Sequence, residues 1–173
     1  MKFVIKNKQT DSYLSNFKPP IVAGTVISGG GFTDGYVRHI PMLIDTGAKH
    51  TLMSKRWMKR ILQRIKDESG QALTPVGESR TQGVYGGEVV SPIYILPYLC
   101  VGNMRFEKVA VVASESDNFD CLIGRSILHC CTFVYDAISD EMSFDFTDSI
   151  PLPRQKVVGV DTFASVGLFA ENS

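Results

Sequence analysis

The sequence predicts an all-β domain with one clear helix. Short runs rich in β-branched residues, such as Ile21–Ile27, alternate with glycine-bearing turns, as turn-rich β folds require. Apolar residues recur at helical spacing in the segment Ser54–Glu68. The chain has 173 residues, which is enough for one domain with a proper hydrophobic core.

The first expected strands lead toward an acidic residue. We expect strands at Lys2–Lys6, Ile21–Ile27 and Tyr36–Ile40, with an irregular arm between the first two. The third strand continues through Pro41 into the stretch Leu43–Ala48, which reads Leu-Ile-Asp-Thr-Gly-Ala. This order suits a buried strand that ends in one carboxylate and then turns sharply.

The helix after this stretch is amphipathic. Ser54 is suited to cap its N-terminus, and Gly70 is expected to end it. Its apolar face carries Trp57, Ile61, Leu62 and Ile65, and its other face carries Lys55, Arg56, Lys59, Arg60, Arg64 and Lys66. We interpret the basic face as a solvated helix surface instead of a binding patch, because 18 basic residues balance 18 acidic ones over the whole chain.

The second half of the chain predicts further hairpins. The last segment, Thr147–Ser173, could wrap a dimer, dock on its own domain or be loose. The expected elements before it are a hairpin with a glycine tip at Glu78–Pro92, paired strands at Tyr94–Val101 and Met104–Ala113, a strand that becomes a short helix at Phe119–Leu128, and a closing hairpin of Thr132–Asp136 with Glu141–Phe146.

Composition excludes several classes of function. The formal net charge of zero gives no electrostatic case for a nucleic acid or an anionic membrane as partner. The apolar block Phe3–Ile5 is too short for a signal peptide, and the longest apolar runs are too short for a membrane span. Cys100, Cys121, Cys130 and Cys131 lack CxxC spacing, so we expect no zinc and a reducing, cytoplasmic location. Cys130 and Cys131 would point to opposite faces if they lay on a strand.

Four features of the sequence point to one kind of chemistry. Asp45-Thr46-Gly47 alone is a weak signal, but two apolar residues precede it and the small Ala48 follows it. The other three features are the polar-polar-apolar-apolar-Ser run His50–Ser54, the glycine-rich hairpin Gly83–Gly87 about 40 residues later, and the stretch Asp120–Leu128, which contains Leu-Ile-Gly-Arg.

In this order the four features resemble the aspartic proteases of the single-domain, retroviral type (retropepsins). The resemblance covers roughly 21–146, and it leaves an N-terminal arm at 1–20 and a tail at 147–173 outside the protease domain. It implies a closed β-barrel with one surface helix after the active-site loop and a short helix after the Leu-Ile-Gly segment. It also implies an endopeptidase that needs no cofactor.

A pepsin-type mechanism needs two carboxylates that share one proton across a water molecule. The chain holds one good Asp-Thr-Gly, since the weak second copy, Val160–Ala164, has phenylalanine where glycine is required. The second aspartate must therefore come from a second copy of the chain, and the resemblance implies a two-fold symmetric homodimer that acts on peptides or proteins.

The resemblance also implies roles for individual residues. Asp45 would be the acid and base, Thr46 would bond to the partner's loop, and Gly47 would make room for the substrate. Ala48 offers no hydroxyl to the carboxylate, so we expect a less acidic optimum than that of pepsin-like enzymes. The substrate would contact Ala48, Lys49, Gly83, Val84, Tyr85, Gly86, Leu122 and Ile123.

For some of these residues an alternative stays open. Tyr85 could belong to a flap that closes over the peptide, or it could be an ordinary hairpin aromatic. Leu122 and Ile123 are first of all core residues, and one of them could line a specificity pocket.

One departure from the retroviral pattern follows Ala48. Viral enzymes carry acids there, one of which pairs with the arginine after the glycine, whereas this chain has Lys49 and His50. We place His50 at the surface or at the rim of the cleft. Arg125 then needs another partner, and Asp120 and Asp136 are the candidates.

Two other functions fit the sequence less well. One is a module that keeps the fold and binds peptides without turnover, although binding alone would not need the acid at position 45. The other is a nucleic-acid-binding β-barrel that uses the basic helix, which the zero net charge disfavours.

Overall fold

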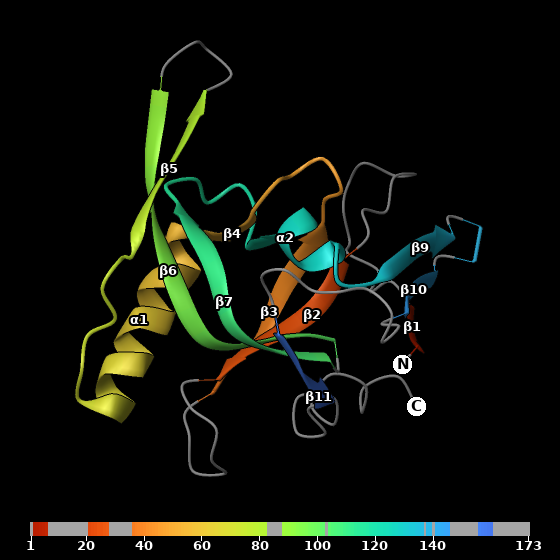
Figure 1. Cartoon of the computed structure of the whole chain (residues 1–173), viewed down its shortest axis with the longest axis horizontal. Coiled ribbons are helices and arrows are strands. Elements are labelled where there is room, and N and C mark those ends of the chain that lie inside the picture. Colours follow the sequence, from red (N-terminus) through yellow and green to blue (C-terminus); the bar gives the residue numbers. More distant parts are fainter. Residues whose placement is uncertain are drawn as a thin grey trace.

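The computed structural model describes residues 2–6, 21–27, 36–82, 88–102, 104–136, 138–139, 141–145 and 156–160. Within these ranges the chain forms eleven strands and two helices (Figure 1). The strands belong to a large mixed sheet and to a separate antiparallel sheet of three strands. The mainly β class predicted from the sequence is thus confirmed.

Six strands of the large sheet close into a barrel. Strand β6 pairs with β2 on one side and with β7 on the other, so the order β7-β4-β8-β3-β2-β6 returns to its start. Closure removes the free edges that an open sheet would present. The barrel strands are β2 (Ile21–Ile27), β3 (Tyr36–Ile44), β4 (Thr51–Ser54), β6 (Glu88–Val101), β7 (Met104–Ser114) and β8 (Cys121–Ile123).

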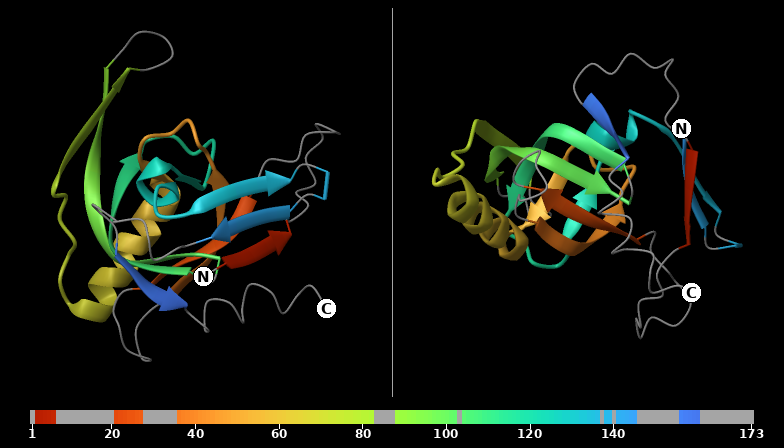
Figure 2. Two further views of the ribbon diagram at one scale, coloured as in Figure 1. Left: turned by 45° about the vertical axis from the view of Figure 1, so that its right-hand side comes forward. Right: turned by 90° about the horizontal axis from the view of Figure 1, so that it is seen from below.

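The remaining strands extend or flank the barrel. Strand β5 (Gly77–Gln82) pairs with the first half of β6, and the two form an arm that projects beyond the barrel (Figures 1 and 2). Strand β11 (Lys156–Val160) pairs with β7. The three-stranded sheet of β1 (Lys2–Lys6), β10 (Glu141–Asp145) and β9 (Thr132–Asp136) lies on the side of the barrel away from the long helix (Figure 2).

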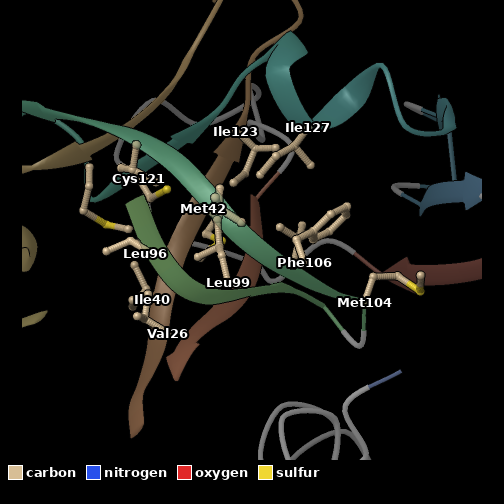
Figure 3. Close-up of a cluster of buried hydrophobic side chains, with 14 of the residues drawn as sticks. Val26, Ile40, Met42, Leu96, Leu99, Met104, Phe106, Cys121, Ile123 and Ile127 are labelled. Atoms are coloured by element: carbon tan, nitrogen blue, oxygen red, sulfur yellow. The ribbon is translucent and has the colours of Figure 1, made fainter. Parts of the chain in front are cut away.

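The interior of the barrel is filled with apolar side chains. Buried side chains alternate along β3 and β8, as the two-residue period of a strand requires, and β6 and β7 contribute further core residues (Figure 3). Each large side chain that is fully buried contributes about 1.5–3 kcal/mol relative to an exposed one. The fully buried large side chains of the core are Ile40, Met42, Met53, Ile61, Leu96, Leu99, Met104, Phe106, Ile123, Ile127 and Phe144.

Helix α1 (Lys55–Ser69) contacts β3, β4 and β7. The hydroxyl of Ser54 accepts a hydrogen bond from the backbone N–H of Trp57, and Gly70 ends the helix with φ of 70°. Both ends therefore match the sequence prediction. No helix in the described ranges is long and apolar enough to cross a membrane.

Three of the six cations on the basic face of α1 are in ion pairs with nearby acids. Lys55 pairs with Glu115, Arg56 with Asp120, and Arg64 with Glu68 one turn later. These contacts fit the interpretation of this face as an ordinary solvated surface.

The structure departs from the sequence prediction at several elements. Strand β6 runs unbroken through Pro92, where a hairpin strand and a separate strand were expected, and the short strand β4 was not predicted at all. Cys130 and Cys131 lie on no strand, because they follow the short helix α2 (Arg125–Leu128) and donate their backbone N–H groups to its last carbonyls.

Candidate active site

Asp45 follows directly after the last residue of β3. This strand runs parallel to β8, and Ile44 lies opposite Ile123. The backbone N–H of Asp45 continues the pairing, since it donates to the carbonyl oxygen of Ile123 at 3.0 Å. Asp45 is half-buried, whereas Ile44 and Ile123 lie in the core. A rigid barrel strand therefore holds the position of this carboxylate.

The turn after Asp45 orients its side chain. Carboxylate oxygen Oδ1 accepts hydrogen bonds from the backbone N–H of Gly47 at 2.8 Å and of Ala48 at 3.2 Å. The other oxygen, Oδ2, has no hydrogen bond within the described part of the chain. One oxygen is thus fixed, and the other is available for a ligand.

Gly47 leaves the space that this arrangement needs. A Cβ atom at this position would lie 3.1 Å from Oδ1 of Asp45, tighter than an ordinary contact. Thr46 and Gly47 are both exposed, so the turn presents its tip to solvent. A side chain at position 47 would therefore press on the Asp45 carboxylate, which would have to shift by a few tenths of an ångström.

The stretch after β8 clamps the loop between β3 and β4. A Cβ atom at Gly124 would lie 2.3 Å from the carbonyl oxygen of His50 and 2.9 Å from that of Ala48, so only glycine lets the two segments cross. The N–H groups of Arg125 and Ser126 donate to the carbonyl oxygens of Ala48 and Lys49 at 2.9 and 3.2 Å.

A second clamp was missed by the sequence reasoning. The hydroxyl of Ser126 accepts a hydrogen bond from the backbone N–H of Thr51 at 3.1 Å and lies 3.0 Å from the Thr51 hydroxyl. Thr51 is fully buried, so this pair satisfies polar groups that water cannot reach. The polar residue that directly follows Leu-Ile-Gly-Arg in the sequence was the signal for it.

A known protein family matches most of this chain. Residues 25–127, more than half of the chain, match the model of a family described as aspartyl protease. The chain belongs to this family. Among curated proteins there is no significant match.

The fold also matches a solved member of the class. The crystal structure of a retropepsin-like aspartic protease from Rickettsia conorii superposes with a TM-score of 0.52 at 18% sequence identity. The match covers 84% of this chain and 91% of that one. At this identity the likeness is evidence for the fold, and this member of the aspartyl protease family has the retropepsin-like barrel.

The other predicted site residues of this family member are only partly described. Leu122 is half-buried and pairs with Leu43 and Leu52, whereas Ile123 is fully buried. The predicted flap, Gly83–Gly87, lies outside the described residues, and so do the substrate contacts predicted at Gly83, Val84, Tyr85 and Gly86. Asp161–Ala164, most of the weak second copy of the motif, lies outside them as well.

The predicted partners of Arg125 were wrong. Asp120 pairs with Arg56, and Oδ1 of Asp136 accepts the backbone N–H groups of Ile138 and Ser139 in its own turn. Both candidate acids therefore already have partners other than Arg125. Arg125 is exposed and has no ion-pair partner in the described part of the chain.

Within the described ranges, no set of three or more His, Cys, Asp and Glu residues is placed to bind an ion. Three of the four thiols are buried, and burial raises the pKa values of Cys121, Cys130 and the half-buried Cys131. Such thiols stay protonated and are poor ligands and nucleophiles.

Proposed function

We propose that this protein is an aspartic endopeptidase that acts as a homodimer. The observation that carries the proposal is the hydrogen bonding of the Asp45 carboxylate and of the loop that holds it. Two backbone N–H groups hold one oxygen, the other oxygen is unbonded within the described residues, and the loop is clamped by Gly124–Ser126. This is the rigid support that a positioned acid or base requires.

The chemistry needs a second carboxylate beside the first. In the proposed dimer, Asp45 of the partner subunit faces the same water molecule, and one proton is shared between the two acids. The ionised carboxylate takes a proton from the water as its oxygen attacks the peptide carbonyl, and the protonated one donates to the carbonyl oxygen. Proton transfer to the amide nitrogen then lets the C–N bond break.

The exposure of the turn supports a two-chain site. Thr46 and Gly47 are exposed in the single chain, and the Thr46 hydroxyl has no partner among the described residues. An isologous contact would bring two such turns together about one two-fold axis. The arm of β5 and β6 projects at the end of the barrel where this turn lies, which supports the predicted flap over an extended peptide (Figure 1).

Replacing Asp45 with asparagine tests the catalytic role. Asp45→Asn keeps the acceptor for the two N–H groups and removes the ionisable acid, so the fold and the dimer should persist. Cleavage of a denatured protein should fall by roughly 10²–10⁴-fold. Asp67→Asn is the matched control, because Asp67 lies on the exposed face of α1 and accepts a hydrogen bond from Gln63.

Mixing the two proteins tests the shared site. If each active site needs two Asp45 carboxylates, an equal mixture of wild type and Asp45→Asn that is allowed to exchange subunits should retain about a quarter of the activity of the same total amount of wild type. Independent single-chain sites would retain about half. Wild type that cleaves nothing between about pH 4 and pH 7, and that ignores a statine-type transition-state analogue, would favour the peptide-binding module instead.

A further inference from the structure

Two exposed cationic residues lie on adjacent backbone segments next to the Asp45 turn. Lys49 and Arg125 are both exposed. Their backbones run together, because Arg125 donates its N–H to Ala48 at 2.9 Å and Ser126 donates to Lys49 at 3.2 Å. The turn that holds the Asp45 carboxylate and the clamp that fixes it therefore each contribute one positive charge to the same rim.

Lys49 and Arg125 differ from the other cations near them in the fold, because those cations are in ion pairs. Lys55 and Arg56, at the start of α1, are paired with Glu115 and Asp120. Neither Lys49 nor Arg125 has an ion-pair partner in the described ranges, and Asp120 and Asp136 are engaged elsewhere. The rim beside Asp45 thus keeps an uncompensated positive charge.

The chain geometry places this charge within reach of a bound peptide. Lys49 is four residues after Asp45, and four residues of chain span at most about 14 Å. An extended peptide rises about 3.3 Å per residue. A substrate side chain within about four residues of the bond under attack can therefore lie opposite Lys49 and Arg125.

We propose that Lys49 and Arg125 form a subsite for an acidic side chain of the substrate. This inference rests on the proposed peptidase function and adds its substrate class: peptides with Asp or Glu close to the scissile bond. The guanidinium of Arg125 can hold a carboxylate through two parallel hydrogen bonds, and the ammonium of Lys49 adds a second charge.

The expected effect is moderate because both cations are exposed. An acidic residue at the preferred position should raise kcat/KM by about 3- to 10-fold over its amide counterpart. The preference should weaken in high salt, because ions screen exposed charges over a length of about 8–10 Å near physiological ionic strength.

The test profiles cleavage of a peptide library by wild type and by a charge-reversed protein. The peptides carry C-terminal amides, so that a side-chain carboxylate is the only acidic group that can explain a preference. Wild type should enrich Asp and Glu within the window, and Lys49→Glu/Arg125→Glu should enrich Lys and Arg instead. Lys59→Glu/Lys66→Glu is the control, since it changes the net charge equally on the exposed face of α1 and should keep the wild-type profile.

The other possible outcomes contradict the subsite, the proposed peptidase function or both. Cleavage without acidic preference in wild type overturns the subsite and leaves the peptidase standing, whereas no cleavage of any peptide overturns the peptidase and the subsite with it. Loss of the dimer in the charge-reversed protein, measured by light scattering, would assign the two cations to the subunit contact. If that protein does not fold, the single variants Lys49→Gln and Arg125→Gln are profiled instead. Each should reduce the acidic preference without inverting it.

Discussion

Gly124 offers the sharpest test of how the barrel supports the site. Its backbone is extended, with φ of −93° and ψ of −176°, a conformation that any residue adopts. Glycine is required there by space alone. A Cβ atom would lie 2.3 Å from the carbonyl oxygen of His50, 2.6 Å from its carbonyl carbon and 2.9 Å from the oxygen of Ala48. All three atoms are backbone, so no side chain can rotate away.

The cost of Gly124→Ala follows from these distances. To reach an ordinary contact of 3.4 Å, the His50 oxygen must move by about 1.1 Å. Overpacking of this kind costs typically 1–3 kcal/mol, and about 1 kcal/mol more is lost if the hydrogen bond from Arg125 to Ala48 stretches. Reduced freedom of the unfolded chain returns about 0.4–1 kcal/mol. We expect a net loss of about 2–3 kcal/mol in the free energy of unfolding.

Activity should fall further than stability alone explains. A displacement of about 1 Å in the loop that carries the carboxylate can cost about 10²-fold in rate. Urea unfolding gives the stability, and cleavage of a denatured protein at a temperature where the variant is folded gives the rate.

Gly77→Ala is the matched control for Gly124→Ala. A Cβ atom at Gly77 would meet nothing within 4 Å, so this variant should be neutral or slightly more stable. If Gly124→Ala unfolds like Gly77→Ala and cleaves like wild type, the loop is not clamped by this crossing and the steric argument is wrong.

Three further variants probe other features of the fold. Ser126→Ala leaves the buried Thr51 N–H and hydroxyl without their partner and should cost about 1–3 kcal/mol in urea unfolding, while Ser126→Thr, which keeps a hydroxyl, should cost less. Lys108 has φ of 53°, a left-handed conformation that costs a side-chain-bearing residue about 1–2 kcal/mol, so Lys108→Gly should raise the free energy of unfolding by roughly 0.5–1 kcal/mol and Lys108→Val should lower it. Burial, followed by the neighbouring Cys130 thiol and the Asp145 carboxylate, raises the pKa of Cys131 from 9.0 to about 12. The folded state therefore holds this proton more tightly than the unfolded chain does, and the stability that it contributes should be lost as the pH rises from about 9 to about 12. Cys131→Ser should show a smaller decline in urea midpoints over this window.

Features that depend on local pattern were predictable from the sequence. Helix α1 was predicted with both of its ends, because Ser54 and Gly70 act on their own turns and the apolar spacing of Trp57 and Ile61 identifies the buried face. The closed barrel came through the resemblance, which also identified the Leu-Ile-Gly segment that contains Gly124. In each case the residues that determine the feature lie within a few positions of one another in the sequence or within one motif.

Features that depend on distant pairing were not predictable. Strand β4 has four residues, and it exists because it pairs with β7 and β8, both of which come much later in the chain. The prediction of an ion-pair partner for Arg125 was wrong for a related reason. Asp120 was a fair candidate by sequence distance, but Arg56 at the start of α1 reaches it, and that approach depends on how the helix packs.

The register of β3 against β8 links the core to the site. Met42 lies opposite Cys121 and Ile44 opposite Ile123, and all four are buried, while Leu43 and Leu122 are half-buried on the other face. A slip of one residue would turn every buried side chain outward, so the hydrophobic alternation fixes this register strongly. Because Asp45 follows Ile44 and Gly124 follows Ile123, the same register brings the carboxylate beside the crossing that clamps its loop. The two motifs therefore form a single unit, in which apolar packing on two short strands decides where the acid is held.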